Sequence, residues 1–550
     1  RYLHLKNKNA ISPIYNKEIP IIPHPIASIE KGSGLVMMCS AGDLSDIQFF
    51  RELKIKPTIA INKDGRMNSN AGFLEGLKVR EAREKIINEL KNRNLIQKQE
   101  EIMHKTPISE RSGTEIEFIE MSEFYLKQIE IKNKIKSIAR KIKFYPPESR
   151  RILYSWIDSI SIDWPISRRR FYATPIPLWY CREKNLVVIP PEGRYYQPWK
   201  ESPPKDAEVY RNGKKIGKVN DFNENWIGEE RVFDTWFDSS ISELFILGYK
   251  RNNEFFNKSY PATLRPQGKE IVRTWLYYTL LRGYLETKKP CFRDVWIHQH
   301  ILDERGRKMS KSLGNVINPQ EIIREIGAEC FRLWIAEEGD LSKQDLSCSK
   351  EKIRSMRKSI NKLINVSRFI MQFKKPEKPK KIEKIDELFI ACIEDLTLYC
   401  DKCYEKYDFY HPAIKLREFL WETFASHYIE LIKSRAYNEE NKFSEEESNS
   451  ARYSLHFILE RYLHLVYPII PQVSSVIAFE KGINLLKADF PKPIKHKVNT
   501  KKIEKIIEFN KKVWKAKKES GISLRSAIKN IKIPRGLEEY EKDIRMCHNL

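Results

Sequence analysis

The arrangement of apolar residues changes once along this chain, near residue 346, and that change limits the folds open to it. Residues 226–335 alternate strand-like and helical runs, which predicts βαβ units around a parallel sheet. Beyond Leu346 the runs become helical, and a broad apolar stripe is typical of a helix facing a bundle core: Leu416, Leu420, Phe424, Tyr428, Leu431 and Ile432. The predicted fold class is therefore multidomain, α/β followed by all-α, as a length of 550 residues also requires.

Residues 1–125 predict a separate, compact α/β unit. Short β-type runs are expected there, at residues 19–22, 35–39 and 58–61. One helix is indicated by apolar residues at three- and four-residue spacing: Val79, Ala82, Ile86, Ile87 and Leu90.

Composition marks further segments between this unit and the helical region, and after it. Residues 126–181 contain a strand-like stretch that begins at Ile152 and leads into an aromatic and basic cluster. Residues 182–225 are rich in Pro, Gly, Lys and polar residues, as expected of an insertion. After a helical region at 346–490, residues 491–550 predict a basic extension.

Lysine and arginine outnumber aspartate and glutamate, 99 to 74, which gives a net charge of +25. A folded protein with that charge is expected to meet a polyanion, with nucleic acid as the first candidate and membrane headgroups as the second. No membrane span is expected, because Pro468 and Pro471 interrupt the long uncharged window at 462–479. Nine scattered cysteines, and no hydrophobic leader after Arg1, favour a reducing cytoplasm.

The most specific local pattern is a string of eight residues that follows Gly306 and Arg307: Lys308, Met309, Ser310, Lys311, Ser312, Leu313, Gly314 and Asn315. Two lysines three apart, among small hydroxyl residues and glycines, can close their ammonium groups on a polyphosphate while the backbone approaches closely. A solvated basic loop is the alternative, and it is the better interpretation of an isolated Lys-x-x-Lys. The full string resembles the KMSKS signature of class I aminoacyl-tRNA synthetases, which implies that residues 308–312 bind ATP.

Further strings resemble the branched-aliphatic subgroup of that class, and the archaeal-type valyl-tRNA synthetases in particular. Residues 163–171, DWPISRRRF, are similar to the W-x-I-S-R-Q strand and turn of the catalytic domain. Residues 233–240, FDTWFDSS, are similar to the valyl DTWFSS segment; Trp236 separates them from the leucyl form, and Thr235 with Ser240 leans away from the isoleucyl form. Residues 265–275, RPQGKEIVRTW, are similar to RPQGHDIIRTW, with Glu270 where that family has aspartate.

The resemblance covers almost the whole chain. Residues 416–421 and 427–431 are similar to the ALREFLW and DHYIELVK helices of the family's anticodon-binding bundle, and residues 32–46 are similar to part of its inserted editing domain. The second class signature, His-x-Gly-His, and the threonine-rich strand of the editing pocket are not among these 550 residues. The resemblance therefore implies an N-terminally truncated chain, either a fragment or one subunit that works beside a separate N-terminal half.

In family terms the resemblance implies this domain order: 1–125 the C-terminal part of the editing insertion, 126–181 the return into a Rossmann-like catalytic domain, 182–225 a degenerate zinc-knuckle-like insertion, 226–345 the second half of the catalytic domain, 346–490 the helical anticodon-binding domain, and 491–550 the start of a C-terminal basic extension.

A structural zinc ion is not expected. Archaeal-type relatives commonly carry paired Cys-x-x-Cys knuckles after the segment that ends here at Pro177, but Cys181 is the single cysteine between residues 178 and 230. The one Cys-x-x-Cys, formed by Cys400 and Cys403, has no second pair nearby. Helix packing is the preferred interpretation of that pair, and metal binding is the alternative.

Two groups of residues keep both a structural and a functional interpretation. The aromatic residues at 164–180, beside Arg168 and Arg169, are either stacking surfaces for unpaired bases or ordinary core. Trp236 and Ile271 are either core residues or, as the resemblance implies, part of an amino-acid pocket limited to the size of valine.

The resemblance implies a ligase that joins valine to its tRNA through valyl-adenylate, with ATP and Mg²⁺ as cofactors and with hydrolytic editing of threonyl-tRNA. The implied site residues are Lys308 and Lys311 for catalysis, Trp236, Glu270 and Ile271 for valine, Asp43 and Asp46 for editing, and Arg168 and Arg169 for tRNA. The alternatives are an isoleucyl-tRNA synthetase and a non-catalytic tRNA-binding fragment.

Overall fold

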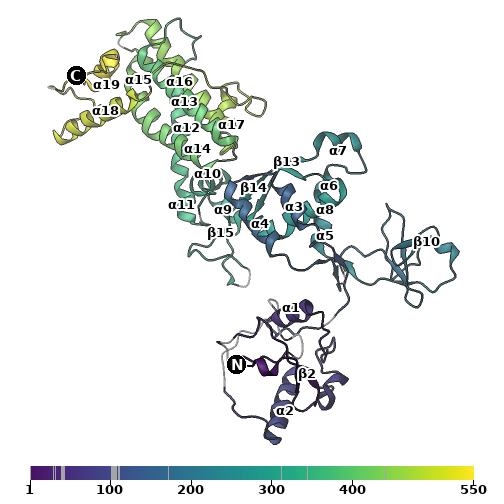
Figure 1. Ribbon diagram of the computed structural model, residues 1–550. Helices are drawn as coiled ribbons and strands as arrows, with labels where there is room; N and C mark the ends of the chain where they lie inside the picture. The colour runs from purple at the N-terminus through teal and green to yellow at the C-terminus, as the bar shows by residue number, and fades with distance from the viewer. Residues whose placement is uncertain are drawn as a thin grey trace. The chain divides into compact units, whose positions relative to one another are not determined.

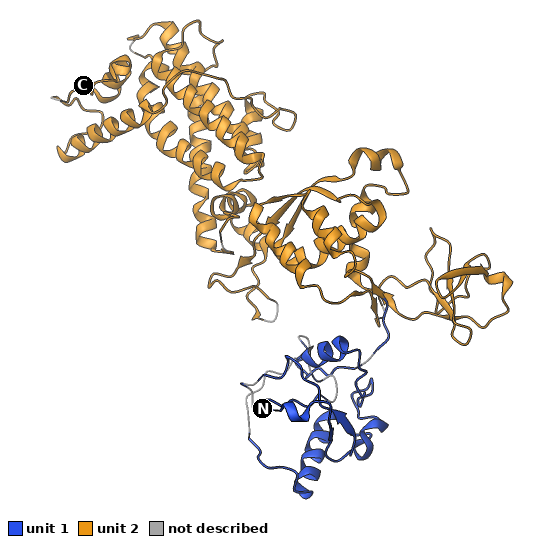
Figure 2. Ribbon diagram, viewed as in Figure 1, with its two compact units in different colours: residues 1–124 blue, residues 125–550 orange. Residues whose placement is uncertain are grey.

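A computed structural model describes residues 2–28, 30, 33–38, 42, 44–100, 108–109, 112–119, 121–170, 172–310, 313–343, 345–439, 441–529 and 531–550. The chain divides into two compact units, Arg1–Phe124 and Tyr125–Leu550, shown in different colours in Figure 2. In the described residues no helix combines the length and the apolar character that a membrane span needs.

The first unit is a small α/β unit with little regular strand. Its elements are η1 (Leu3–Leu5), β1 (Asn9–Ile11), β2 (Glu18–Pro20), α1 (Leu44–Glu52), η2 (Ser69–Leu74) and α2 (Val79–Asn92). The predicted helix is confirmed as α2, and the Glu81 carboxylate near its start accepts the backbone N–H of Lys78 at 3.0 Å. Its residue Ala82 packs with Ala71 and Leu74 in a small core.

Two of the strands expected in this unit do not form in the described residues. Residues 35–38 are irregular, and in the run at 58–61 Ile61 makes an isolated bridge to Met67. The run at 19–22 is partly confirmed, because β2 covers its start and pairs antiparallel with β1. A short apolar run becomes a strand only where a neighbouring strand pairs with it, which the local sequence does not reveal.

The second unit contains the predicted parallel sheet. Its strands lie in the order β13 (Ala262–Gly268), β14 (Phe292–His298) and β4 (Lys143–Tyr145), and both pairings are parallel. Helices α3 (Lys132–Ala139) and α8 (Tyr277–Thr287) share one hydrophobic core with this sheet (Figure 1). The α/β part of the fold class is confirmed.

The strand expected from Ile152 is wrong, because this segment is helix α4 (Arg150–Ser159). Leu153 and Ile157 are buried on one face of that helix, and Ile160 follows at the helix end. Their spacing of four and three residues is helical, although the β-branched residues nearby favour a strand locally.

The insertion folds as a five-stranded antiparallel sheet with a hydrophobic core of its own, which includes Trp179, Leu186 and Val209. Its strands, in the order in which they pair, are β10 (Lys214–Lys218), β9 (Glu208–Arg211), β8 (Leu186–Ile189), β7 (Trp179–Cys181) and β11 (Ile227–Gly228). Close packing explains one glycine here, since a Cβ at Gly228 would overlap the backbone carbonyl of Pro198.

Short elements connect the insertion, the parallel sheet and the helical region. Before β13 they are β3 (Tyr125–Leu126), η3 (Pro147–Ser149), β5 (Trp164–Pro165), β6 (Ser167–Arg168), η4 (Val219–Asp221), β12 (Val232–Phe233), α5 (Thr235–Ser239), α6 (Ser242–Ile246) and α7 (Asn253–Ser259). From β13 onward they are η5 (Lys269–Ile271), the π-helical turn η6 (Val272–Leu276), β15 (Ile301–Leu302), α9 (Pro319–Glu325), α10 (Ala328–Glu338) and β16 (Leu346–Ser347).

The predicted helical region is confirmed, and its long helices α12, α13 and α16 lie side by side in Figure 1. All six residues of the predicted stripe at 416–432 are buried in one core. The elements are α11 (Lys350–Ser355), α12 (Arg357–Met371), α13 (Lys384–Tyr404), α14 (Tyr410–Glu418), the π-helix η8 (Phe419–Tyr428), α15 (Ile429–Tyr437), α16 (Glu445–Val466), α17 (Pro471–Glu480), α18 (Lys502–Glu519), η9 (Glu538–Tyr540) and α19 (Glu541–His548).

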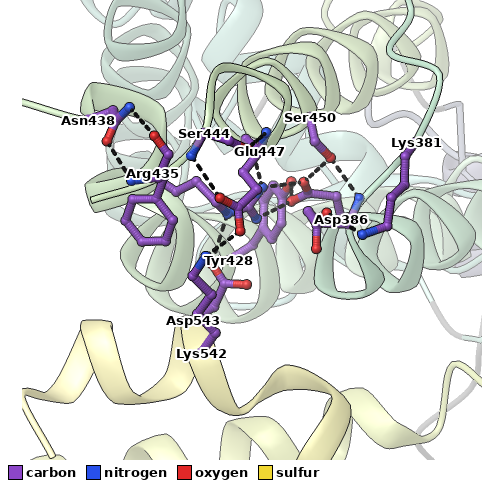
Figure 3. Close-up of polar contacts among 12 residues, drawn as sticks. Lys381, Asp386, Tyr428, Arg435, Asn438, Ser444, Glu447, Ser450, Lys542 and Asp543 are labelled. Atoms are coloured by element: carbon purple, nitrogen blue, oxygen red, sulfur yellow. Dashed lines mark hydrogen bonds and ion pairs between the residues drawn. The ribbon is translucent and has the colours of Figure 1, made fainter. Parts of the chain in front are cut away.

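A buried ionic network joins the last helix to this bundle (Figure 3). Arg435 on α15 is 1% exposed; its guanidinium donates to the Asp386 carboxylate on α13 at 2.8 and 2.9 Å and to Asp543 on α19 at 2.9 Å. Tyr428 and Ser450 donate hydroxyl hydrogen bonds to Asp386 at 2.7 and 2.5 Å. The carboxylate is thus fully paired, and α19 belongs to the same packed unit as the bundle.

Candidate functional site

The parallel sheet brings two predicted segments to one edge. In an open parallel sheet ligands bind beyond the carboxyl ends of the strands. Strand β13 ends at Gly268, directly before Lys269 and Glu270, and its neighbour β14 ends at His298, two residues before His300. The side chains that follow both strands therefore lie at the same edge.

Glu270 contacts a histidine from the neighbouring strand end. Its carboxylate Oε2 lies 3.1 Å from Nε2 of His300, and the glutamate side chain is 48% exposed. The carboxylate also folds over the Cα of Gly268, where any Cβ would overlap it. Burial lowers the pKa of the nearby His298, although the negative charge of Glu270 acts in the opposite direction. A half-exposed carboxylate here can receive a cationic ligand group.

A second carboxylate, Asp345, holds this edge of the sheet together. It accepts hydrogen bonds from the Lys269 ammonium at 2.6 Å and from the backbone N–H of His300 at 2.9 Å. Burial would raise the pKa of Asp345, but these hydrogen bonds outweigh it and the pKa is lowered. The residue after it begins β16, which pairs in parallel with β15, so the segment after His300 is fixed as well.

The loop that carries Lys308 leaves directly from β15. The backbone of Lys308 forms a bridge with Leu302, which lies two residues beyond His300, about 7 Å along an extended strand. The Lys308 side chain is exposed, and its ammonium group makes no ion pair with any residue that the structure describes. Met309 next to it packs against the bundle core. Lys311 and Ser312 lie outside the described residues.

Trp236 lies on α5, beside the core that η6 and α8 share. The Asp234 carboxylate caps this helix by accepting the backbone N–H of Trp236 at 2.6 Å. Trp236 and Ile271 are both half-buried and pack against the same hydrophobic cluster. Trp236 also lines a cavity of about 330 Å³ together with Arg168, Arg170, Ala173, Phe233, Asp234 and Thr235.

The two arginines proposed for tRNA differ in their surroundings. The guanidinium of Arg168 forms an ion pair with Asp234 and donates to the backbone carbonyls of Pro165 and Ser167, both at 2.7 Å. These contacts hold strand β6 against β12 and orient Arg168 toward the protein. Arg169 is exposed.

Of the two aspartates proposed for editing, Asp43 lies outside the described residues. Asp46 is on the first turn of α1, where its Oδ2 accepts the backbone N–H of Gly42 at 2.9 Å. This contact occupies one carboxylate oxygen of Asp46.

The cysteines of the Cys-x-x-Cys lie near the end of α13. Cys400 is fully buried in the bundle core and Cys403 is half-buried. Burial raises the pKa of the Cys400 thiol to about 12, which disfavours the thiolate that a metal or a nucleophilic role would need.

The structure thus brings Glu270, Ile271 and the Lys308 loop to one edge of the sheet, with Trp236 against the adjoining core. Sequence reasoning did not single out His300, Asp303 or Asp345 at this edge. The pair His298 and His300, within the region predicted to alternate strands and helices, was a usable signal. Asp345 carries no local signal, because its partners Lys269 and His300 lie far from it in the sequence. Asp303 precedes the string that begins at Lys308, and its hydrogen-bond donors lie within residues 305–315.

Comparisons with known proteins agree with this architecture. The model for the class I tRNA synthetases (I, L, M and V) matches residues 69–348, and the model for the anticodon-binding domain of tRNA ligases matches residues 386–533. The parallel sheet followed by this helical bundle is therefore the architecture of a class I tRNA synthetase.

Individual relatives narrow the family. The chain is 39% identical to the valine–tRNA ligase of Aeropyrum pernix, over 100% of this chain and 67% of that one. It is 41% identical to the valine–tRNA ligase of Nanoarchaeum equitans, over 100% of this chain and 70% of that one. The chain belongs to the valine–tRNA ligase family. Among solved structures, the methionyl-tRNA synthetase of Mycobacterium tuberculosis in complex with methionyl-adenylate superposes with a TM-score of 0.49 and 18% identity, over 68% of this chain and 65% of that one.

Proposed function

We infer that this chain carries the amino-acid and KMSKS side of a site that ligates valine to tRNA. One observation supports the proposal most strongly. The ammonium group of Lys308 is exposed, and the Lys308 backbone bridges to Leu302. Leu302 lies two residues after His300, whose imidazole contacts the Glu270 carboxylate. At one edge of the sheet, the Lys308 ammonium group is therefore proposed to bind phosphate and the Glu270 carboxylate to bind the α-ammonium group of the amino acid.

The proposed first step forms valyl-adenylate. The valine carboxylate oxygen attacks the α-phosphorus of ATP, the bond to the bridging oxygen breaks, and pyrophosphate leaves. In the second step the ribose hydroxyl of the tRNA terminal adenosine attacks the valyl carbonyl carbon, the bond from that carbon to the phosphate oxygen breaks, and AMP leaves with the hydroxyl proton. Neither step needs a covalent enzyme intermediate, so catalysis comes from positioning and from positive charge where phosphate charge develops. Lys308 supplies that charge, with Lys311 assigned the same role.

Glu270, Trp236 and Ile271 are proposed to hold valine. The Glu270 carboxylate would accept the α-ammonium group, while the indole of Trp236 and the β-branched Ile271 would limit the side chain to the size of valine. Their half-buried positions against a shared core support this role, because a pocket wall must be fixed on one side and open on the other.

Mg²⁺ is proposed to arrive with ATP. In the described part of the chain no cluster of three or more His, Cys, Asp or Glu side chains is arranged to hold a metal ion. This fits Mg²⁺, which commonly keeps several waters and is held mainly by substrate phosphates. Bound there, it supplies charge neutralisation of the phosphates.

The tRNA is proposed to contact the helical domain and, near its acceptor end, Arg169 and Arg168. The match to an anticodon-binding domain over residues 386–533 and the net charge of +25 support this assignment. Arg169 is exposed whereas Arg168 is half-buried beside Asp234, so Arg169 is the more accessible candidate for a phosphate contact.

Hydrolytic editing of threonyl-tRNA is proposed for the first unit, with Asp46 and Asp43 binding the ammonium group of the mischarged amino acid. A pocket shaped for valine cannot strongly reject threonine, which replaces a methyl group by a hydroxyl; this pair is an established example of that limit. Asp46 lies on the first turn of α1, where its carboxylate accepts the backbone N–H of Gly42.

The test of the proposed function is amino-acid-dependent exchange between ATP and pyrophosphate. It uses the completed enzyme, meaning these residues together with a polypeptide that supplies His-x-Gly-His. Valine is expected to support exchange better than isoleucine. Exchange that favours isoleucine would select the isoleucyl alternative, and tRNA binding without any exchange would select the non-catalytic alternative.

A further inference from the structure

One buried carboxylate, that of Asp303, binds both ends of the loop that carries Lys308. Asp303 is 6% exposed, and its Oδ1 accepts the backbone N–H groups of Arg305 at 3.0 Å and Arg307 at 2.8 Å. Its Oδ2 accepts the Arg307 Nε–H and the Asn315 side-chain amide, both at 2.9 Å. All four donors belong to residues 305–315, so a single side chain closes the loop at its base.

Asn315 extends this closure to the residues on either side of Met309. Its Oδ1 accepts the backbone N–H of Ser310 at 2.9 Å, and its side-chain amide also donates to the backbone carbonyl of Lys308 at 3.1 Å. The Lys308 backbone is therefore fixed by Asn315 and by its bridge to Leu302, while its ammonium group is exposed.

We propose that Asp303 is a positioning residue for the phosphoryl step, and that it acts with Asn315 by fixing the backbone from which Lys308 reaches the substrate phosphates. The proposal rests on the proposed function of Lys308. A charged group stabilises a transition state most when its position is fixed before the reaction, and a misplacement of about 1 Å can cost roughly 100-fold in rate.

The chemistry of Asp303 suits this role. The hydrogen bond from Asn315, with that from the backbone of Arg307, lowers the pKa of Asp303 to about 2. The side chain is therefore ionised at neutral pH and only accepts hydrogen bonds. In Asp303→Asn an amide NH₂ replaces one acceptor oxygen and meets donors, so the closure is lost with almost no change in volume.

Asp340 offers a matched control. It is similarly buried, accepts hydrogen bonds from the backbone N–H and hydroxyl of Ser342 at 3.0 and 2.6 Å, and pairs with Lys343 at 3.2 Å. It makes no hydrogen bond with the loop residues that the structure describes. Asp340→Asn therefore tests whether any loss of a buried carboxylate in this region slows the enzyme.

The decisive experiment measures valine-dependent ATP–pyrophosphate exchange for four forms of the completed enzyme: the parent, Asp303→Asn, Lys308→Ala and the double variant. Asp303→Asn is expected to lower kcat roughly 10- to 100-fold with an unchanged KM for valine, because Glu270 and Trp236 are untouched. In the Lys308→Ala background the same change is expected to cause no further loss, since its effect passes through Lys308.

The outcomes separate the inference from the proposed function. An equal loss from Asp303→Asn in both backgrounds, or no loss at all, overturns the positioning role while leaving the role of Lys308 intact. Full exchange by Lys308→Ala overturns both. Asp340→Asn is expected to match the parent, and a loss equal to that of Asp303→Asn would also overturn the inference.

Limited digestion with trypsin tests the closure in the 550-residue chain itself. Asp303→Asn is expected to accelerate cleavage after Arg305, Arg307 and Lys308, as followed by mass spectrometry, whereas Asp340→Asn is not. Unchanged cleavage at these bonds in Asp303→Asn would show that the carboxylate does not hold the loop.

Discussion

Replacing Asp386 by alanine is expected to lower the free energy of unfolding of the helical bundle by about 3–5 kcal/mol, the usual cost of breaking a buried ion pair by removing one partner. The carboxylate is fully buried and accepts four hydrogen bonds, two from Arg435 and one each from Tyr428 and Ser450 (Figure 3). Its removal leaves the guanidinium, itself 1% exposed, with Asp543 as a carboxylate partner. That remaining pair prevents a larger loss.

Urea denaturation followed by circular dichroism at the helical band measures the change, because the bundle contains most of the long helices. Ser450→Ala is the matched control: it removes one of the four hydrogen bonds from the same carboxylate and is expected to cost about 1 kcal/mol. Equal and small shifts for both variants would refute the reasoning, because they would mean that the buried guanidinium does not depend on Asp386.

Three further predictions concern pH, metal and tRNA. Burial raises the pKa of Glu243 to about 7, so the folded state binds this proton more tightly than the unfolded state, and stability is expected to fall as pH rises through 7. Thermal melting of Glu243→Gln at pH 6 and pH 8 should no longer show that fall. An unchanged pH slope in the variant would contradict the prediction. Elemental analysis is expected to find substoichiometric zinc, and stoichiometric zinc that disappears on replacing Cys400 and Cys403 would show a metal site. Arg169→Ala is expected to weaken tRNA binding and to reduce the salt dependence of the binding constant by about 1 in its logarithmic slope. Arg168→Ala is expected to have a smaller effect, because that side chain pairs with Asp234. A loss of tRNA binding that does not depend on salt would point to misfolding instead.

Patterns that repeat within one element predicted the structure well. Helix α2 and the buried stripe at 416–432 follow from a three- and four-residue spacing, because one face of a helix is set by its own sequence. The parallel sheet followed from alternating strand and helix patterns over 226–335. The resemblance supplied the site segments, since Glu270 and Lys308 lie in strings long enough to be specific.

Features that depend on distant partners were not predictable. Helix α4 was expected as a strand, because Ile152 and its neighbours favour both structures and packing against the sheet decides between them. The sheet of the insertion forms from strands of two to five residues in a Pro- and Gly-rich segment. The hydrogen bond between Asp303 and Asn315 joins residues twelve apart; Asn315 ends the string that begins at Lys308, but nothing in the local sequence marks Asp303 as its partner.

Lys308 is proposed to act on the phosphates of ATP and not on the tRNA backbone. The most direct measurement compares Lys308→Ala with the parent in the completed enzyme, in valine-dependent ATP–pyrophosphate exchange and in tRNA binding. The exchange rate is expected to fall because the variant loses about 2–4 kcal/mol of transition-state stabilisation, as for loss of one preorganised donor. The affinity for tRNA is expected to stay the same. Weakened tRNA binding with intact exchange would contradict the claim and identify the loop as a nucleic-acid contact.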